Sequence, residues 1–166
     1  MSNIIFLNNG HLAIEGAKLK FRNFEGRQEQ YNNLGDRNFA VTVDDPEMVQ
    51  RLIDEGWNIK SWTPQDDPDA IIYYIKVKVS YRFTPPVIDL IGSRNTQSLN
   101  EDTAGIADRA NFSNVDLEIS PSHWNMADGR SGITAYLSAM YATITEDYFG
   151  ATKYNNGPQD EEAPFN

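Results

Sequence analysis

The sequence contains no cysteine, so it has neither a disulfide framework nor a thiolate metal site. Histidine is almost absent as well: His11 and His123 stand far apart, without the spacing of metal ligands. No glycine-rich phosphate loop appears, and no nucleophile sits in a recognisable elbow. These absences argue against an enzyme, and we expect no cofactor and no bound metal.

Long apolar runs are missing too. No stretch approaches the length needed to span a bilayer, and residues 1–10 lack the basic flank and cleavage pattern of a signal peptide. We therefore expect a cytoplasmic protein with no membrane partner.

Basic residues are scarce: 14 stand against 24 acidic ones, for a net charge of −10. Such a balance argues against a nucleic-acid partner for the chain as a whole. Asp160, Glu161 and Glu162 lie in the last seven residues, and without them 21 acidic residues still face 14 basic ones. A nucleic-acid site would therefore have to be a local basic face.

What the chain does contain is enough apolar material for one core. It has 166 residues, of which 40% are hydrophobic, including 8 Phe, 8 Tyr and 3 Trp. From Gly150 onward, Asn, Gly, Pro and acidic residues dominate, a composition typical of disorder. We expect one folded domain over residues 1–149 and a flexible acidic tail over residues 150–166.

Alternating and β-branched segments predict about seven strands. They cover residues 12–24 (one long strand or a pair), 37–43, 58–62, 70–83, 87–91, 115–119 and 133–145. Residues 70–83 should end at Pro85, and residues 115–119 should stop at Pro121. Residues 96–110 fit either a loop or a short helix. The pattern predicts a mainly β protein, an antiparallel barrel closed or nearly so.

One helix is predicted at about residues 45–56. Asp45 is a suitable N-cap, Pro46 fits the first turn, and Gly56 ends the helix. Met48, Val49, Leu52 and Ile53 fall at helical spacing.

Two strands carry bases on one face. Alternation places Ala17, Leu19 and Phe21 inward and Lys18, Lys20 and Arg22 outward. In residues 71–83 it predicts an inner row of Ile71, Tyr73, Ile75, Val77, Val79, Tyr81 and Phe83. The outer row is then Ile72, Tyr74, Lys76, Lys78, Ser80 and Arg82. Neither outer face contains an acid. Cations beside exposed rings are what a single-strand binder needs, although amphipathic strands often carry bases outward without such a role.

Other aromatic and basic residues flank these strands. Phe24 would join the basic face if its strand continues; Trp57 and Trp62 flank Lys60; Arg37 begins a strand. We treat Trp124 as packing. The candidate DNA-binding residues are Lys18, Lys20, Arg22, Phe24, Arg37, Trp57, Lys60, Trp62, Tyr74, Lys76, Lys78 and Arg82.

The last residues, Asp160-Glu161-Glu162-Ala163-Pro164-Phe165-Asn166, resemble the acidic tip of bacterial single-stranded-DNA-binding proteins. In that family the acids compete with DNA for its groove and the terminal Phe docks into replication partners. The resemblance implies a partner-binding tail of Asp160, Glu161, Glu162, Pro164 and Phe165. Asn166 is a departure, because the bacterial tip ends on its Phe carboxylate.

Four internal segments carry a second resemblance. They are Phe21-Arg22-Asn23-Phe24-Glu25-Gly26, Arg37-Asn38-Phe39-Ala40-Val41, Glu55-Gly56-Trp57-Asn58-Ile59-Lys60 and Gly132-Ile133-Thr134-Ala135-Tyr136-Leu137. They are similar to a family of small phage and prophage proteins assigned as single-stranded-DNA binders on an OB-like fold. The resemblance implies a non-enzymatic, sequence-independent binder in phage DNA replication or recombination, located in the cytoplasm of the infected or lysogenic bacterium. It would contact replication or recombination proteins through its tail and could form homo-oligomers.

Two alternatives remain open. The overall acidity fits a phage β-barrel adaptor, a structural protein or a DNA-mimicking inhibitor of a host protein. Asp116 and Glu118 share a strand face, as in the beginning of a metal-dependent nuclease site, but no lysine follows them where such sites place one.

Overall fold

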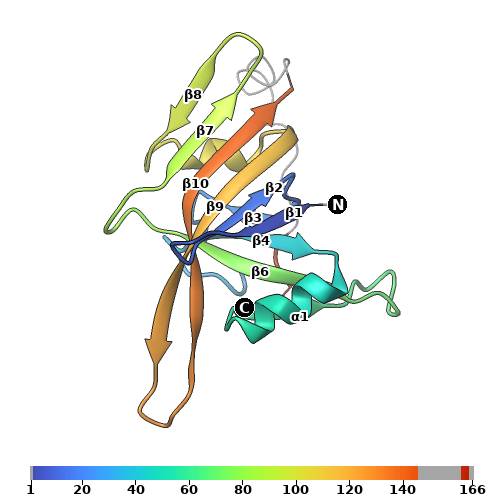
Figure 1. The fold of residues 1–166 in the computed structure, drawn as a ribbon. Helices are drawn as coiled ribbons and strands as arrows, with labels where there is room; N and C mark the ends of the chain where they lie inside the picture. The colour runs from blue at the N-terminus through green and yellow to red at the C-terminus, as the bar shows by residue number, and fades with distance from the viewer. Residues whose placement is uncertain (1, 146–161, 165–166) are drawn as a thin grey trace.

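The computed structural model describes residues 2–145 and 162–164. Ten strands form it: β1 (Asn3–Phe6), β2 (Leu12–Glu15), β3 (Leu19–Asn23), β4 (Arg37–Val43), β5 (Ile59–Trp62), β6 (Ile72–Val79), β7 (Val87–Ile91), β8 (Thr96–Leu99), β9 (Phe112–Asn125) and β10 (Ser131–Ile144). Helix α1 spans Pro46–Asp54, and the short 3-10 helix η1 spans Ala104–Asp108 (Figure 1). The prediction of a mainly β fold with one α-helix is confirmed for the described residues.

The strands form one open sheet, and β2 near one end of it and β3 at the other end belong to one continuous chain segment. Its order is β1-β2-β9-β10-β6-β4-β3, with β5 on β6, β7 on β10 and β8 on β7. Only residues 16–18 separate β2 from β3, and these residues continue both pairings. The Ala17 amide donates to the Val115 carbonyl at 2.7 Å, and the Lys18 carbonyl accepts from the Thr42 amide at 3.1 Å. Residues 12–23 are therefore one interrupted strand, shared by the two ends of the path.

Pairing is not wholly antiparallel. β10 runs parallel to β6 and to β7, whereas the other pairings are antiparallel. One edge of β6 is covered by β4; the other is shared, because β5 pairs with Ile72 to Ile75 and β10 with Val77 and Lys78. Lys76 lies where β5 gives way to β10.

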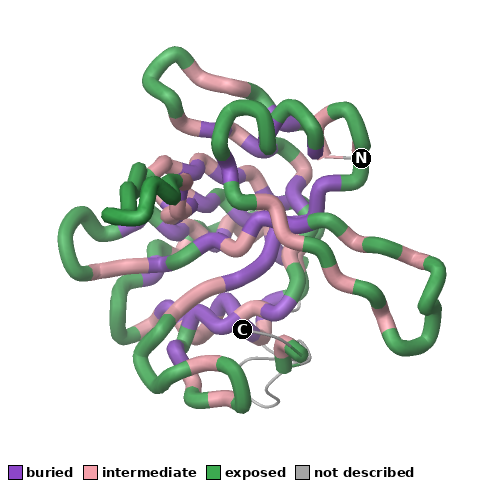
Figure 2. Tube along the Cα trace, turned by 90° about the horizontal axis from the view of Figure 1, so that it is seen from below, coloured by how far each residue is buried: buried purple, intermediate pink, exposed green. Residues whose placement is uncertain are grey.

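The core fills the space between these strands. One buried cluster includes several side chains with no exposed surface: Leu12, Ile14, Val41, Val77 and Ile119. Buried positions lie along the strands, while the loops around them are exposed (Figure 2). The alternation of apolar residues along each strand accounts for this, since side chains two apart share a face.

Helix α1 forms for the predicted reasons. The Asp45 carboxylate accepts from the Glu47 amide at 3.0 Å, Pro46 occupies the first turn, and Gly56 has a φ of 98° just beyond the end. Leu52 is fully buried. Ile53, at helical spacing with these residues, is 47% exposed.

Two strands end elsewhere than predicted. β6 ends at Val79, so Phe83 lies outside the sheet and is 86% exposed. β9 runs through Pro121, which pairs with Ala135 on β10; β2 covers β9 only as far as Ile119, so no neighbour needs the missing proline N–H. The resulting β9–β10 hairpin projects from one end of the molecule, opposite β7 and β8 (Figure 1).

Residues 96–110 combine strand β8 with η1, where we expected a loop or a short helix. No helix within the described ranges has the length and apolar character that a membrane span requires.

Candidate nucleic-acid interface

One outer face of the sheet gathers lysines from three strands. The register places Lys20 opposite Ala40 and Ala40 opposite Lys76, so one row crosses β3, β4 and β6. Lys60 lies opposite Tyr74, which shares its face of β6 with Lys76. We call Lys20, Lys60, Lys76 and Lys78 the basic face. Four of the predicted binding residues are therefore brought together by strand pairing.

Lys76 is the central member of the basic face. Its partial burial, and then the positive charges of Lys60 and Lys78, lower the pKa of its ammonium group; only Asp36 acts in the opposite direction. Because these positive charges repel one another at a half-buried position, the site favours binding of an anion from solution. A phosphate at this point would relieve the repulsion.

A groove of about 780 Å³ lies along the end of the basic face. Its lining includes the cations Arg37, Lys76, Lys78 and Arg82 and the aromatic rings of Tyr31, Tyr81 and Tyr136. Tyr136 is the cross-strand partner of Lys78 on β10, and Tyr31, in the loop before β4, is 42% exposed. The groove thus offers both charge for a phosphate chain and rings for bases.

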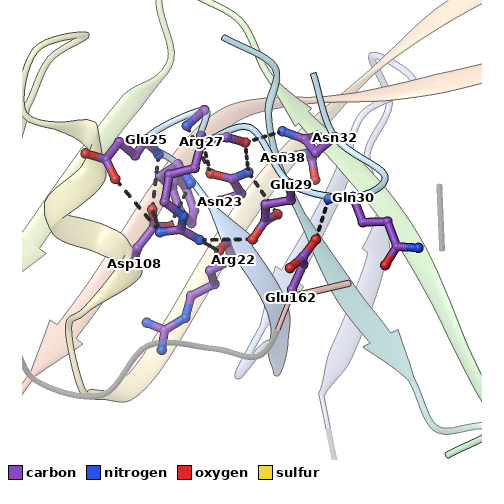
Figure 3. Close-up of polar contacts among 12 residues, drawn as sticks. Arg22, Asn23, Glu25, Arg27, Glu29, Gln30, Asn32, Asn38, Asp108 and Glu162 are labelled. Carbon is purple, nitrogen blue, oxygen red and sulfur yellow. Dashed lines mark hydrogen bonds and ion pairs between the residues drawn. The ribbon is translucent and has the colours of Figure 1, made fainter. Parts of the chain in front are cut away.

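The loop that forms one wall of the groove, residues 24–36, is held by a buried asparagine. The Asn23 side-chain oxygen accepts from the amides of Gly26 at 3.0 Å and Arg27 at 2.9 Å. Its Nδ2 donates to the Arg27 carbonyl at 3.0 Å (Figure 3). Gly26 has a φ of 79°, and a Cβ there would come within 3.1 Å of the Gly35 backbone. The close approach requires glycine at this position.

A buried carboxylate fastens the same loop to η1. Asp108, 1% exposed, accepts from the amides of Phe24 at 2.7 Å and Glu25 at 3.1 Å, and pairs with the Arg27 guanidinium at 3.0 Å. Burial raises the pKa of Asp108, while these hydrogen bonds and the charge of Arg27 act against the rise. Asp108 fixes the start of the loop, and with it the wall of the groove.

The expected alternation along β3 fails after Lys20. Phe21 has a φ of 53°, and the register slips between Lys20 and Asn23. This bulge turns Phe21 to the outer face, where it packs with Ala40 and Tyr74. Phe21 was expected inside, so that assignment is wrong.

The bulge also redirects Arg22 and Phe24. The Arg22 guanidinium donates to the carbonyls of Ala107 at 3.0 Å and Ala110 at 2.7 Å and lies 4.9 Å from the Phe112 ring centroid. Phe24 is fully buried and stacks on Phe39 at 5.0 Å. The expectation that Arg22 and Phe24 belong to an exposed basic face is wrong, because the left-handed Phe21 reverses the faces.

Two other predicted stacking residues are buried. Tyr74 is 3% exposed because Phe21, Trp62 and Ala163 cover it, and this burial raises the pKa of its hydroxyl to about 12. Trp57 is 5% exposed in the main core. Neither ring is open to a base in this conformation, contrary to prediction. Trp62 is half-buried, edge-on to Phe21 at 5.0 Å, with the Lys20 ammonium 5.9 Å from its ring.

Along β6 the inner row also differs from prediction at its start. Ile71 is 58% exposed and Tyr73 38%, whereas Ile75, Val77 and Val79 are buried as expected. Ile71 precedes the strand, so alternation does not fix its face.

Two of the remaining predicted bases, Arg37 and Lys18, have structural contacts. The Arg37 Nε donates to the Phe24 carbonyl at 2.8 Å, and its Nη2 to the Glu101 carbonyl at 3.1 Å, which ties β4 to the loop. Lys18 stands 3.9 Å from the Asp44 carboxylate, at the far end of β3 from the groove. Arg82 is exposed at the groove.

Part of the C-terminal segment lies on the same face. The Gln30 amide donates to the Glu162 carboxylate, and Ala163 packs against the cluster of Phe21, Ala40 and Tyr74 (Figure 3). Burial, followed by the charges of Glu162 and Asp108, raises the pKa of Glu29, and Arg27 opposes this. Asp160, Glu161 and Phe165 lie outside the described residues.

Tyr31 and Tyr136 were not predicted as site residues. Tyr136 follows the alternation of β10 and could have been placed on an outer face, but its position beside Lys78 depends on a parallel pairing that local sequence does not specify. Tyr31 lies in a loop whose path depends on Asn23 and Asp108.

The candidate nuclease residues lie elsewhere, on β9. The Asp116 carboxylate accepts from the Gly16 amide at 3.0 Å, and Glu118 pairs with the His11 ring at 2.6 Å. Among the described residues, no group of three or more His, Cys, Asp or Glu side chains could hold a metal ion.

A family model described as "Putative phage ssDNA-binding domain" matches residues 1–165. The chain belongs to this family. Its membership confirms the resemblance seen in the four internal segments. No curated protein matches the chain.

Two solved structures of one phage protein share the fold. The single-stranded DNA-binding protein from bacteriophage Enc34 is 14% identical, with a TM-score of 0.53 over 86% of this chain and 85% of that one. A C-terminal truncation of the Enc34 protein gives 12% identity and a TM-score of 0.53 over 87% and 91%. The gp2.5 single-stranded DNA binding protein encoded by bacteriophage T7 is 10% identical, with a TM-score of 0.40 over 97% and 100%.

Proposed function

We propose that this member of the phage family binds single-stranded DNA without sequence preference, through the basic face and the groove beside it. The observation that carries the proposal is the juxtaposition of Lys76, Lys78 and Arg82 with Tyr31 and Tyr136 in one groove. The family to which the chain belongs is described by the same ligand.

The chemistry divides between phosphate and base. Ammonium and guanidinium groups attract the sugar–phosphate chain and release its counterions, which makes binding depend on salt. Rings stack on any base, since every base has a π-face, so the site does not select a sequence. No step breaks a covalent bond, and we propose a non-catalytic role in phage DNA replication or recombination, in the host cytoplasm.

The C-terminal segment supplies the proposed regulation. Glu162 accepts from Gln30 in the loop beside the groove, and Ala163 packs on Phe21, Ala40 and Tyr74 and lines a small pocket with Lys76, so an incoming strand would meet them. We propose that the tail, residues 150–166, restrains DNA binding by occupying this face. Its acidic residues and Phe165 would also recruit replication or recombination proteins when DNA displaces them.

The remaining expectations about assembly also belong to the proposal. Residues 1–149 would form an OB-like binding domain, consistent with strand 12–23 serving both ends of the sheet path. Homo-oligomers are compatible with the exposed edges of β1 and β8, but the proposed binding mode does not require them.

The test is a fluorescence-anisotropy titration of labelled oligo-dT with the full-length protein, at about 0.05 M and about 0.2 M salt. A duplex of equal length is the control. We expect tight binding to the single strand, weakening as salt rises, and weaker binding to the duplex. Equal affinity for both, or no binding at low salt with and without the tail, would overturn the proposal.

A second candidate function rests on acidic residues on other strands of the sheet. Glu15, Asp89, Asp116 and Glu118 occupy the outer faces of β2, β7 and β9, and the register places Asp116 opposite Tyr141 and Tyr141 opposite Asp89. An acidic sheet face suits an adaptor or a DNA-mimicking inhibitor of a host protein. It becomes the preferred function if oligo-dT does not bind.

A further inference from the structure

We propose that the β9–β10 hairpin carries a second nucleotide subsite, built on Trp124 and Lys60, which extends the DNA path across β6. This inference rests on the proposed single-stranded-DNA binding and deepens it. The main groove reaches across β6 from the loop before β4 to Tyr136 of β10, and the second subsite lies farther along β6, beside β5 and the start of β10.

The Trp124 ring packs against the backbone of Gly132. Trp124 pairs with Gly132 across the hairpin, and a Cβ on Gly132 would stand 2.7 Å from the indole Cζ2 and 3.0 Å from Cε2. The ring therefore lies directly against the glycine backbone, where no larger residue fits. Trp124 is nevertheless 39% exposed, so this support does not bury it. A ring held on one side and open to solvent is suited to stacking.

The ring faces a cavity of about 430 Å³ whose lining includes Lys60, Lys76 and Lys78. This cavity sits where β5 and β10 meet along β6, next to the bridge between Trp57 and Ile133. Lys76 and Lys78 also line the main groove. The two hollows therefore share a pair of cations, and a strand leaving one enters the other.

The chemistry of the cavity favours a nucleotide. None of the described residues that line it is acidic, whereas Asp36 and Glu101 line the main groove. The charges of Lys60 and Lys78 both act on Lys76 and lower the pKa of its ammonium group. An anionic ligand with a flat ring satisfies the amines and the indole together, and a nucleotide of single-stranded DNA is such a ligand.

The experiment uses the full-length protein and two oligo-dT lengths, about 4 and about 12 nucleotides, within the range that one OB-type domain covers. The variants are Trp124→Ala and Trp124→Phe. The matched control is Met126→Ala, which truncates another exposed apolar side chain of the same hairpin that does not line the cavity. Circular-dichroism melting checks that each variant is folded.

We expect Trp124→Ala to weaken binding of the longer oligonucleotide about tenfold, the usual effect of removing one stacking ring, and to leave the shorter one unchanged. Trp124→Phe should keep most of the affinity but lose much of the tryptophan quenching that DNA causes, since Trp57 is buried and Trp62 half-buried. Met126→Ala should match the parent with both lengths.

The inference is overturned if the longer oligonucleotide binds folded Trp124→Ala as tightly as the parent, or if both lengths weaken equally. An undiminished quenching signal in Trp124→Phe would overturn it independently. In each case the parent still binds oligo-dT, which separates this failure from failure of the proposed function, where the parent binds neither length. If Trp124→Ala instead weakens only the effect of the acidic tail, the subsite accepts an acidic peptide and the nucleotide assignment is wrong.

Discussion

Replacing Lys76 by glutamine should weaken single-stranded-DNA binding without weakening the fold. Lys76 occupies the centre of the basic face, borders both cavities, and has a pKa lowered by burial and by the charges of Lys60 and Lys78. The substitution keeps a polar side chain of similar length and removes one charge. Because that charge is repelled in the free protein, its loss should not lower the thermal midpoint.

The size of the binding effect follows from counterion release. Each phosphate neutralised on a single strand contributes about 0.7 to the slope of log affinity against log salt concentration. Lys76→Gln should therefore reduce the slope by about 0.7 and weaken binding about fivefold at 0.1 M salt, with the difference vanishing near 1 M.

The assay is oligo-dT anisotropy at four or more salt concentrations. The control is Arg94→Gln, which removes the same charge in the exposed turn between β7 and β8. Arg94→Gln should leave the slope unchanged. If the two variants weaken binding equally, the effect is that of net charge, and the assignment of Lys76 to a phosphate contact is refuted. A parental slope in Lys76→Gln would refute it as well.

Three further predictions follow from the same contacts. Asp108→Asn should destabilise the fold by about 2 kcal/mol in denaturant titrations, because it leaves Arg27 without its buried partner, and a parental midpoint would show that the clamp is not structural. Removing residues 157–166 should tighten oligo-dT binding, with the largest gain at low salt; unchanged or weaker affinity would contradict tail competition. Affinity should fall as pH rises through the lowered pKa of Lys76, since only its charged form attracts phosphate, and the fall should begin at higher pH in Lys76→Gln; coincident pH profiles would exclude this role for Lys76.

Much of the basic face was predictable because alternation is a local property. Lys20, Lys76 and Lys78 point outward as the pattern requires, and pairing through Ala40 and Asn38 brings their strands together. Helix α1 was predictable for a similar reason, because the residues that begin and end it, Asp45 and Gly56, lie close together in the sequence.

The wrong face and exposure assignments have two causes: an irregular backbone conformation, and side chains distant in sequence that cover a strand face. A single left-handed residue, Phe21, exchanges the faces of Arg22 and Phe24. Tyr74 lies on the predicted outer face, yet Phe21 and Trp62 cover it. Alternation assigns a face, but it does not say whether a neighbouring strand or loop closes over that face.

The groove itself could not be predicted from the strands. Tyr31 reaches it from a loop held by Asn23 and by Asp108, whose partners are more than 80 residues away in sequence. Trp124 was treated as packing because a tryptophan at an element boundary is more often partly buried. The continuation of β9 to Asn125 is what carries that ring to the lysines.

The most direct test of the central claim is amide chemical-shift mapping of the full-length protein during titration with oligo-dT. DNA that binds across β6 should shift the amides of Tyr31, Lys76 and Lys78, while those of β1 and β8 keep their positions. Shifts confined to the acidic faces of β2, β7 and β9, with β6 unaffected, would contradict the account.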